Sequence, residues 1–192
     1  MSDGADDEAD LLVRAREGDR RAFGEVVRRY QRRVYGVARR IVRQHDMADD
    51  VVQDTFLRAF ERLASFDPSR PFGPWICRIA SNLAINVVRS PKFREEELPD
   101  GHEEARGPRL DPLDLVLEDE ARRSVAKALQ ALPVEQRAVV VLRAVEELSY
   151  GEIAGALGIS EGTVMSRLFR ARNRLAELLA PVLAVRRARV VP

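Results

Sequence analysis

Apolar residues recur at intervals of three and four along most of this chain, and that spacing constrains its fold more than any other feature. Glycines and prolines stand at the ends of these runs, and no strand-like alternation is seen. Gly18 is placed to stop a short helix over residues 10–17, and Asp19 is placed to cap a longer one. The apolar face of the longer helix consists of Phe23, Val26, Val27, Tyr30, Val34, Val37, Ala38, Ile41 and Val42. The pattern predicts an all-α protein.

Breaks in the pattern divide the helices into two modules. In the first, helices are predicted over about 47–64, with Val52, Phe56, Phe60 and Leu63 buried, and from Pro74 to about residue 90. Residues 91–112 are rich in proline, glycine and acids and have few apolar side chains, so they are predicted to form a flexible linker. The second module opens near Leu113 with a helix to about residue 132, and Pro133 opens the next helix.

We therefore expect two small helical domains joined by a flexible acidic linker, the C-terminal one containing a helix-turn-helix. The predicted boundaries are an acidic disordered N-terminus at 1–9, a first domain at 10–91, the linker at 92–112, a second domain at 113–180 and a basic tail at 181–192.

The net charge of +1 hides a segregation of charge along the chain. Residues 14–43 hold eleven arginines and three acids, residues 92–120 hold eleven acids and four bases, and residues 166–189 hold seven arginines and one acid. Two basic blocks separated by an acidic one are typical of two modules that meet a polyanion. A coding bias toward arginine is an alternative explanation for the excess of arginine over lysine, but it does not explain the segregation.

Composition also excludes several classes of function. No apolar run approaches the roughly 18–20 residues of a membrane span, and the acidic first ten residues do not look like a secretory signal. A single cysteine excludes a disulfide framework, and two histidines offer little for metal catalysis. We expect a cytoplasmic protein with no membrane insertion, no metal site, no cofactor and no catalytic residues.

The strongest motif spans residues 148–164, with the sequence LSYGEIAGALGISEGTV. Ser149 with Glu152 forms a capping box, Gly158 permits a left-handed turn, and Ser160 is placed to cap a second helix. This pattern is typical of a helix-turn-helix whose second helix enters the major groove of DNA. The arginines that follow suit phosphate or guanine. The alternative is a helical hairpin that binds nothing.

A second motif is the acidic start of the helix predicted at 47–64. Asp50 and Asp54 lie one turn apart on one face, with Gln53 beside them. Acids in a first turn also stabilise the helix dipole, and that simpler interpretation suffices for these residues taken alone. A di-iron carboxylate site would need a histidine three residues after a glutamate, and neither histidine has that spacing.

The third motif covers residues 66–89. Arg78, Asn82, Asn86 and Arg89 share one helical face, and Phe72 and Trp75 stand at its beginning. Asparagine amides read base edges, and aromatic rings receive unstacked bases in single-stranded recognition. The alternative places both aromatic rings in the core and leaves the asparagines without a role.

Taken together and in order, these motifs resemble the sigma-70 family of bacterial transcription initiation factors, specifically its extracytoplasmic-function (ECF), sigma-E-like group. The resemblance runs from about residue 10 to 179 and rests on DVVQDTF (50–56), FGPWICRIASNLAIN (72–86), LP (132–133), LSYGEIA (148–154) and GTVMSRLFRAR (162–172). It implies a promoter-specificity subunit in which the first module looks like region 2 and the second like region 4.

The resemblance also implies roles for individual residues. Contacts to the clamp of core RNA polymerase are implied for Asp50, Gln53, Asp54 and Phe56. Recognition of the −10 element, including capture of a flipped non-template base, is implied for Arg70, Phe72, Trp75, Arg78, Asn82 and Asn86. Recognition of the −35 duplex is implied for Thr163, Ser166, Arg167, Phe169 and Arg170.

The implied partners are core RNA polymerase (clamp and flap), promoter DNA as duplex and as non-template single strand, and an anti-sigma factor. The acidic linker is implied to lie in the channel where RNA later exits. One departure is Met165, which stands where similar proteins often carry a basic residue, so contacts there are expected to differ. Two other classes remain as rivals, a dimeric helix-turn-helix regulator and an adaptor that binds only proteins.

Overall fold

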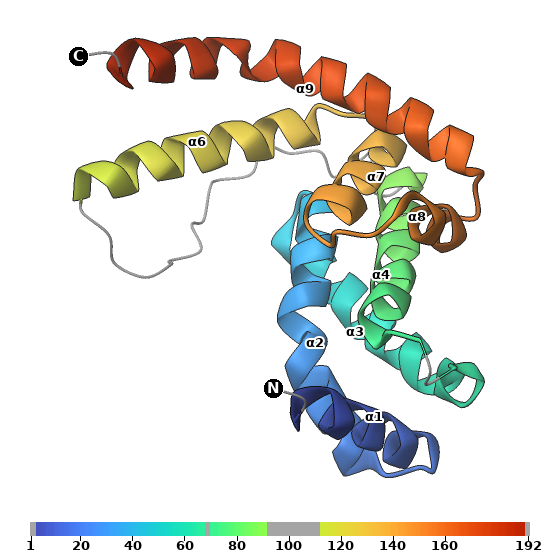
Figure 1. Cartoon of the computed structure of the whole chain (residues 1–192). Helices are drawn as coiled ribbons and strands as arrows, with labels where there is room; N and C mark the ends of the chain where they lie inside the picture. The colour runs from blue at the N-terminus through green and yellow to red at the C-terminus, as the bar shows by residue number, and fades with distance from the viewer. Residues whose placement is uncertain (1–2, 68–69, 92–111, 191–192) are drawn as a thin grey trace.

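The computed structural model describes residues 3–67, 70–91 and 112–190, and within these ranges the chain forms helices and no strands (Figure 1). The prediction of an all-α fold is therefore confirmed. The elements are α1 (Asp3–Arg16), α2 (Arg20–Ile41), α3 (His45–Arg62), η1 (Leu63–Ser65), α4 (Phe72–Arg89), α6 (Pro112–Gln130), α7 (Val134–Ala144), α8 (Tyr150–Leu157) and α9 (Glu161–Val190).

In the first module, α2 packs against α1, α3 and α4. Its N-terminus is capped as the sequence predicts, since the Asp19 carboxylate accepts hydrogen bonds from the backbone N–H groups of Arg21 and Ala22. The apolar face of α2 is buried through Val34, Val37 and other small apolar residues. One correction concerns the N-terminus, where α1 begins at Asp3 and so extends into the segment predicted to be disordered.

The second module contains the predicted helix-turn-helix in α8 and α9. The Ser149–Glu152 capping box is formed, Gly158 adopts a left-handed conformation with φ of 65°, and the Ser160 hydroxyl accepts from the backbone N–H of Thr163 at 3.2 Å. Helix α9 runs on through Pro181 to Val190, so the segment predicted to be a separate basic tail continues this helix as far as that residue. The predicted linker lies almost entirely outside the described residues, and α6 begins at Pro112.

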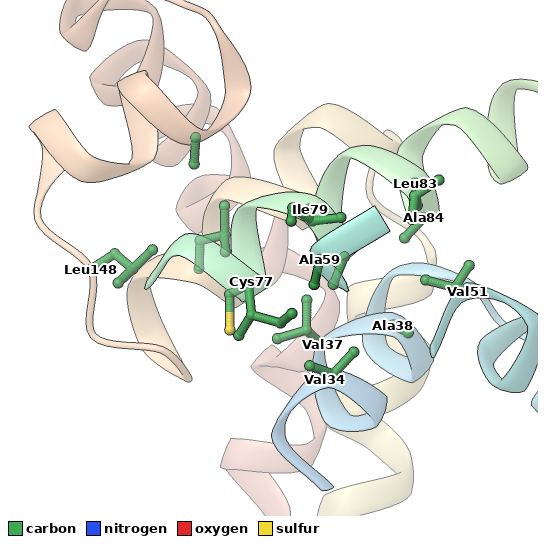
Figure 2. Packing of buried hydrophobic residues seen from close by; sticks show 14 of the residues in the cluster. Val34, Val37, Ala38, Val51, Ala59, Cys77, Ile79, Leu83, Ala84 and Leu148 are labelled. Atoms are coloured by element: carbon green, nitrogen blue, oxygen red, sulfur yellow. The ribbon is translucent and has the colours of Figure 1, made fainter. Parts of the chain in front are cut away.

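The two modules pack against each other, with α4 against α7 and α8 and α2 against α6 and α7. One apolar core runs through both. The labelled residues of Figure 2 lead from Val51 and Ala38 through Cys77 to Leu148, which belongs to the second module. The sequence predicted each module's core, but the apolar continuity between them emerges only from the packing.

Arg137 of α7 lies beside the C-terminal ends of α2 and α6. Its guanidinium is almost fully buried, with 7% of the residue exposed, and donates hydrogen bonds to carbonyl oxygens of both modules. The acceptors are the carbonyls of Ile41 (2.5 Å), Gln130 (2.8 Å), Leu129 (3.0 Å) and Leu132 (3.0 Å). These carbonyls sit at the C-terminal ends of α2 and α6 or just beyond, where they lack intrahelical partners and where the helix dipole is negative.

Replacement of Arg137 should therefore destabilise the whole fold. We expect Arg137→Met to lower the free energy of unfolding by about 3 kcal/mol, because several buried carbonyls lose a charged donor together. Urea unfolding followed by circular dichroism measures this change. The matched control is Arg172→Met, at an exposed arginine of α9, which should shift the midpoint little. Equal midpoints for both variants would contradict the assigned role.

Candidate nucleic-acid and partner interface

Asp50, Gln53 and Asp54 project into solvent from the exposed face of α3, as the spacing predicts. Leu57 lies on the same face one turn further on and is 63% exposed, which is unusual for a leucine in a packed helix. The surface is therefore an acidic and amide edge next to an apolar side chain, a composition suited to a protein partner.

Phe56 does not belong to this exposed set. It is 7% exposed and packs largely in the core, so the implied contact from its ring to the polymerase stays a prediction. Its ring instead helps to line an open hollow of about 580 Å³ between α2 and α3. Phe60, predicted to be buried, is 43% exposed at this hollow and packs edge-on against Phe23 at 5.0 Å between ring centroids. The hollow is lined by Arg20, Phe23, Val27, Gln31, Val52, Gln53, Phe56, Leu57 and Phe60.

The polar face of α4 is present, but its members differ in access. Arg78 and Asn86 are exposed. Asn82 is half-buried, and its side-chain amide donates to the carbonyl of Ala156 in α8 at 2.8 Å. Arg89 is bound by a carboxylate of the second module, as described below. Two residues of this face are therefore exposed, and the other two contact the second module.

Phe72 and Trp75 form an aromatic cluster with Phe66 at the start of α4. Phe72 is 1% exposed and is held edge-on by Phe66, with 5.4 Å between ring centroids, and by Tyr30 at 5.0 Å. A ring buried to this degree has no free surface for a base, so the implied base contact of Phe72 is a correction. Trp75 is half-buried and stacks at an angle on Phe66 at 4.9 Å. Arg70 is exposed and lies 3.4 Å from the Asp67 carboxylate.

The first turns of α9 hold the third set. The Thr163 hydroxyl shares a hydrogen bond with Ser160 at 2.9 Å, and the Ser166 hydroxyl donates to the carbonyl of Thr163 at 3.0 Å. Arg170 reaches back to the Ser166 hydroxyl at 3.4 Å, while Arg167 is half-buried. These side chains lie on one side of α9 at intervals of about one turn. A helix that contacts bases in the major groove has this arrangement.

Phe169 and Met165 occupy a neighbouring face of α9. They are 66% and 50% exposed respectively, and neither can donate a hydrogen bond to phosphate or guanine. Apolar side chains of this kind can meet a thymine methyl group in the major groove.

Glu135 of α7 interacts with arginines of two other helices, α4 and α9. It accepts from the Arg89 guanidinium of α4 at 2.5 and 3.0 Å. Partial burial raises the pKa of Glu135, but the hydrogen bond from Arg89, with the charge of Arg167 adding to it, outweighs burial and leaves the pKa below its usual value. Glu135 therefore pairs with Arg89 and also feels the charge of Arg167, and these two arginines come from separate motifs.

Among the described residues, no group of three or more histidine, cysteine, aspartate or glutamate side chains could hold a metal ion. None of the helices in the described ranges is both long enough and apolar enough to cross a membrane.

The two modules each match a known family model. A model of sigma-70 region 2 covers residues 26–94, and a model of sigma-70 region 4 covers residues 122–175. The ECF RNA polymerase sigma-E factors of Salmonella typhimurium and Escherichia coli are each 34% identical over 181 residues, which are 90% of this chain and 94% of theirs. The chain belongs to the ECF group of the sigma-70 family.

Similar proteins extend to other bacteria and to solved structures. The ECF sigma factor SigE of Mycolicibacterium smegmatis is 37% identical over 161 residues, 83% of this chain and 62% of that protein. A chain in the complex of CnrH with the cytosolic domain of CnrY superposes with a TM-score of 0.65 at 34% identity, covering 91% of this chain and 98% of the other. The complex of RpoE with the anti-sigma factor NepR from Bartonella quintana gives 0.65 at 28% identity, with coverages of 82% and 96%.

The exposed residues of the predicted sites lie on α3, α4 and α9, whereas Phe56 and Phe72 pack in the core of region 2. Leu57 was missed, although its position three residues after Asp54 placed it on the same face. Glu135 was missed because nothing in its local sequence indicates that it meets Arg89 of the other region.

The capping box of α8 offers a test of how the helix-turn-helix is built. Ser149→Ala should lower the free energy of unfolding by about 1 kcal/mol, because the backbone N–H of Glu152 loses its acceptor. The control is Ser166→Ala, where the hydroxyl donates to a carbonyl within α9 and alanine is the better helix former. Thermal unfolding of both variants checks the difference. A loss for Ser166→Ala as large as for Ser149→Ala would argue against the cap.

Proposed function

We propose that this chain is a promoter-specificity factor that binds core RNA polymerase, directs it to promoters through −10 and −35 elements and promotes strand opening. The observation that carries the proposal is the presence of regions 2 and 4 in order, each with an exposed polar face on one helix. The chain supplies binding energy and no catalytic step, and its place of action is the cytoplasm, where bacterial transcription occurs.

The polymerase-binding surface is assigned to the exposed face of α3. Asp50, Gln53 and Asp54 supply charge and hydrogen bonds, and Leu57 supplies an apolar contact beside the hollow between α2 and α3. A polar edge around an exposed apolar side chain is the usual make-up of a protein interface. Phe56 packs in the core on the inner side of α3 and so stabilises this face.

Recognition of the −10 element is assigned to α4 and the loop before it. Arg78 and Asn86 are exposed, and Trp75 is half-buried, so part of its side chain is accessible for the proposed contact with a base. Holding flipped bases would offset their unstacking, which costs a few kcal/mol each. Arg70 is exposed, and we assign it to the phosphate backbone.

Recognition of the −35 duplex is assigned to the first turns of α9. Arg167 and Arg170 are three residues apart on one side and can reach base edges, while Thr163 and Ser166 provide hydroxyls near the backbone. The exposed ring of Phe169 provides an apolar contact.

An anti-sigma factor is proposed as a further partner. The support is the similarity to RpoE, which was solved with the anti-sigma factor NepR and superposes with a TM-score of 0.65. If a regulator is encoded beside this chain, the purified regulator should suppress the transcription described next in proportion to its concentration.

The function is tested by transcription of genomic DNA with core polymerase, with and without this chain, followed by sequencing of the RNA 5′ ends. We expect a small set of new start sites with shared sequences at −10 and −35. An identical set of starts in both reactions would overturn the proposal. If the new start sites share only a −10 or only a −35 sequence, only one of the two regions recognises DNA.

The polymerase surface is tested by charge reversal on α3. Asp54→Arg should weaken binding to core polymerase by about tenfold or more, because an exposed acid becomes a base in the assigned interface. Glu17→Arg makes the same reversal at an exposed residue outside α3 and should bind as the unmodified chain does. Fluorescence anisotropy titration measures both affinities. Equal affinities for the two variants would show that this face of α3 is not part of the interface.

The duplex surface is tested by two arginines of α9. Arg170→Ala should cost about 1–3 kcal/mol on a matched −35 duplex and relax the preference at one position, if it pairs with guanine. Arg174, which already pairs with Glu177 at 2.9 Å, lies one turn further on. Arg174→Ala should weaken all duplexes alike and reduce the salt slope by about one unit, or have no effect. If both variants lose the same affinity on every duplex and have the same salt slope, Arg170 does not contact a base.

A further inference from the structure

Two adjacent rows of side chains follow the outer side of the first turns of α9, and they differ in chemistry. One row is polar and consists of Ser166 and Arg170, whose guanidinium donates to the serine hydroxyl at 3.4 Å. The other row is apolar and consists of Met165 and Phe169, each one residue earlier in the chain. Residues four apart lie on the same side of a helix, so each row runs along α9.

The packing of α9 into region 4 does not use the apolar row. Helices α6, α7 and α8 pack against α9, and its buried residues are Val164, Leu168 and Ala171. Met165 is 50% exposed and Phe169 is 66% exposed, so both side chains point away from that packed side. The row is therefore available to a partner.

The surroundings of the apolar row are basic. Residues 161–174 hold four arginines and one acid, Glu161. The Glu161 carboxylate lies against Gly151 in the first turn of α8, where a Cβ atom would come within 3.2 Å of it. In a helix-turn-helix, the N-terminal residues of the second helix are the ones that reach base edges. Apolar side chains among cations at this position suit a negatively charged partner that carries apolar groups, and the major groove of DNA is such a partner.

The chemistry of the row favours one base. Neither side chain donates a hydrogen bond, and the thioether accepts only weakly. The edges of guanine, adenine and cytosine would therefore lose water without gaining a hydrogen bond, whereas thymine presents a methyl group in the major groove. Met165 and Phe169 are about 6 Å apart along the helix axis, which is the scale of one or two base-pair steps.

We propose that Met165 is a specificity-determining residue of the −35 contact and selects a thymine by packing its thioether against the 5-methyl group. Phe169 extends the same apolar contact along the groove. The proposal rests on the assignment of α9 to the −35 duplex under the proposed function, and it adds which base is read and by which chemical group. Burial of one methyl group corresponds to about a fourfold gain in affinity.

Replacement of thymine by deoxyuridine tests this contact, because the two bases differ only in the 5-methyl group. The −35 duplex is first obtained by affinity selection with the full-length chain from a random-sequence pool, and each of its thymines is then replaced in turn. We expect the unmodified chain to lose about fourfold in affinity at one thymine or at two neighbouring ones. A selected sequence without a shared thymine, or an affinity that responds to no replacement, would overturn the proposal.

The variant Met165→Ala shows whether this side chain meets the methyl group. The thymine and deoxyuridine duplexes should then bind equally at that position, because the methyl group has lost its partner. Leu183→Ala is the matched control, since Leu183 is an apolar residue of α9 with a similar exposure of 53% and lies much further along the helix. It should keep the fourfold difference. If Met165→Ala also keeps that difference, another side chain contacts the methyl group and the assignment of Met165 is wrong.

A change of preference tests the role of Met165 in specificity. Met165→Arg places hydrogen-bond donors where the thioether was, and arginine pairs with guanine in the major groove. Selection with this variant should replace the thymine at that position, with guanine as the expected base, and should leave the other positions unchanged. Recovery of the same thymine with both chains would contradict a role in specificity.

The proposed function and this inference fail in different measurements. If selection yields no preferred sequence with the unmodified chain, the assignment of −35 recognition to α9 fails, and the inference about Met165 fails with it. If a sequence is selected but responds neither to deoxyuridine nor to Met165→Ala, only the inference about Met165 is overturned. If Met165→Ala weakens binding to core polymerase and leaves DNA binding unchanged, the apolar row binds protein and the inference is again overturned.

Discussion

The structure depends on how the chain satisfies the carbonyl groups at the ends of its helices. Arg137 donates to carbonyls near the ends of α2 and α6, and these belong to different regions of the protein. A cation at the negative ends of helix dipoles gains from both the hydrogen bonds and the field. Burial and the nearby Arg43 lower the pKa of Arg137 to about 10, so the guanidinium remains charged at neutral pH. One side chain thereby joins the end of α2 in region 2 to the end of α6 in region 4.

That placement explains why some of the proposed recognition residues are exposed and others are covered. The apolar core passes from region 2 into region 4, as Figure 2 shows, while charged and amide groups surround the boundary. Apolar burial is the main contribution to this packing of the two regions, and the polar contacts around it contribute less.

Much of the local structure was predictable because its causes lie within a few residues. The caps at Asp19 and Ser149 and the left-handed turn at Gly158 followed from residue type and spacing. The exposed set on α3 and α9 also followed from helical periodicity. The burial of the Phe56 and Phe72 rings in the core was not predicted, because a motif does not reveal which side of a ring faces the core. Helix α1 was predicted too short, since composition alone suggested disorder.

The amino-acid sequence by itself determined the all-α class, the order of two modules, the family and the helices that carry the proposed recognition residues. These depend on short-range periodicity, capping and motif spacing, which are written along the chain. The tertiary structure alone decided that Glu146 is buried against Arg33 and Cys77, that Asn82 is engaged by α8, and that Arg137 joins both regions. These contacts join residues about 70 to 110 positions apart, and the free energy that selects them comes from burying specific surfaces together, which no local pattern encodes.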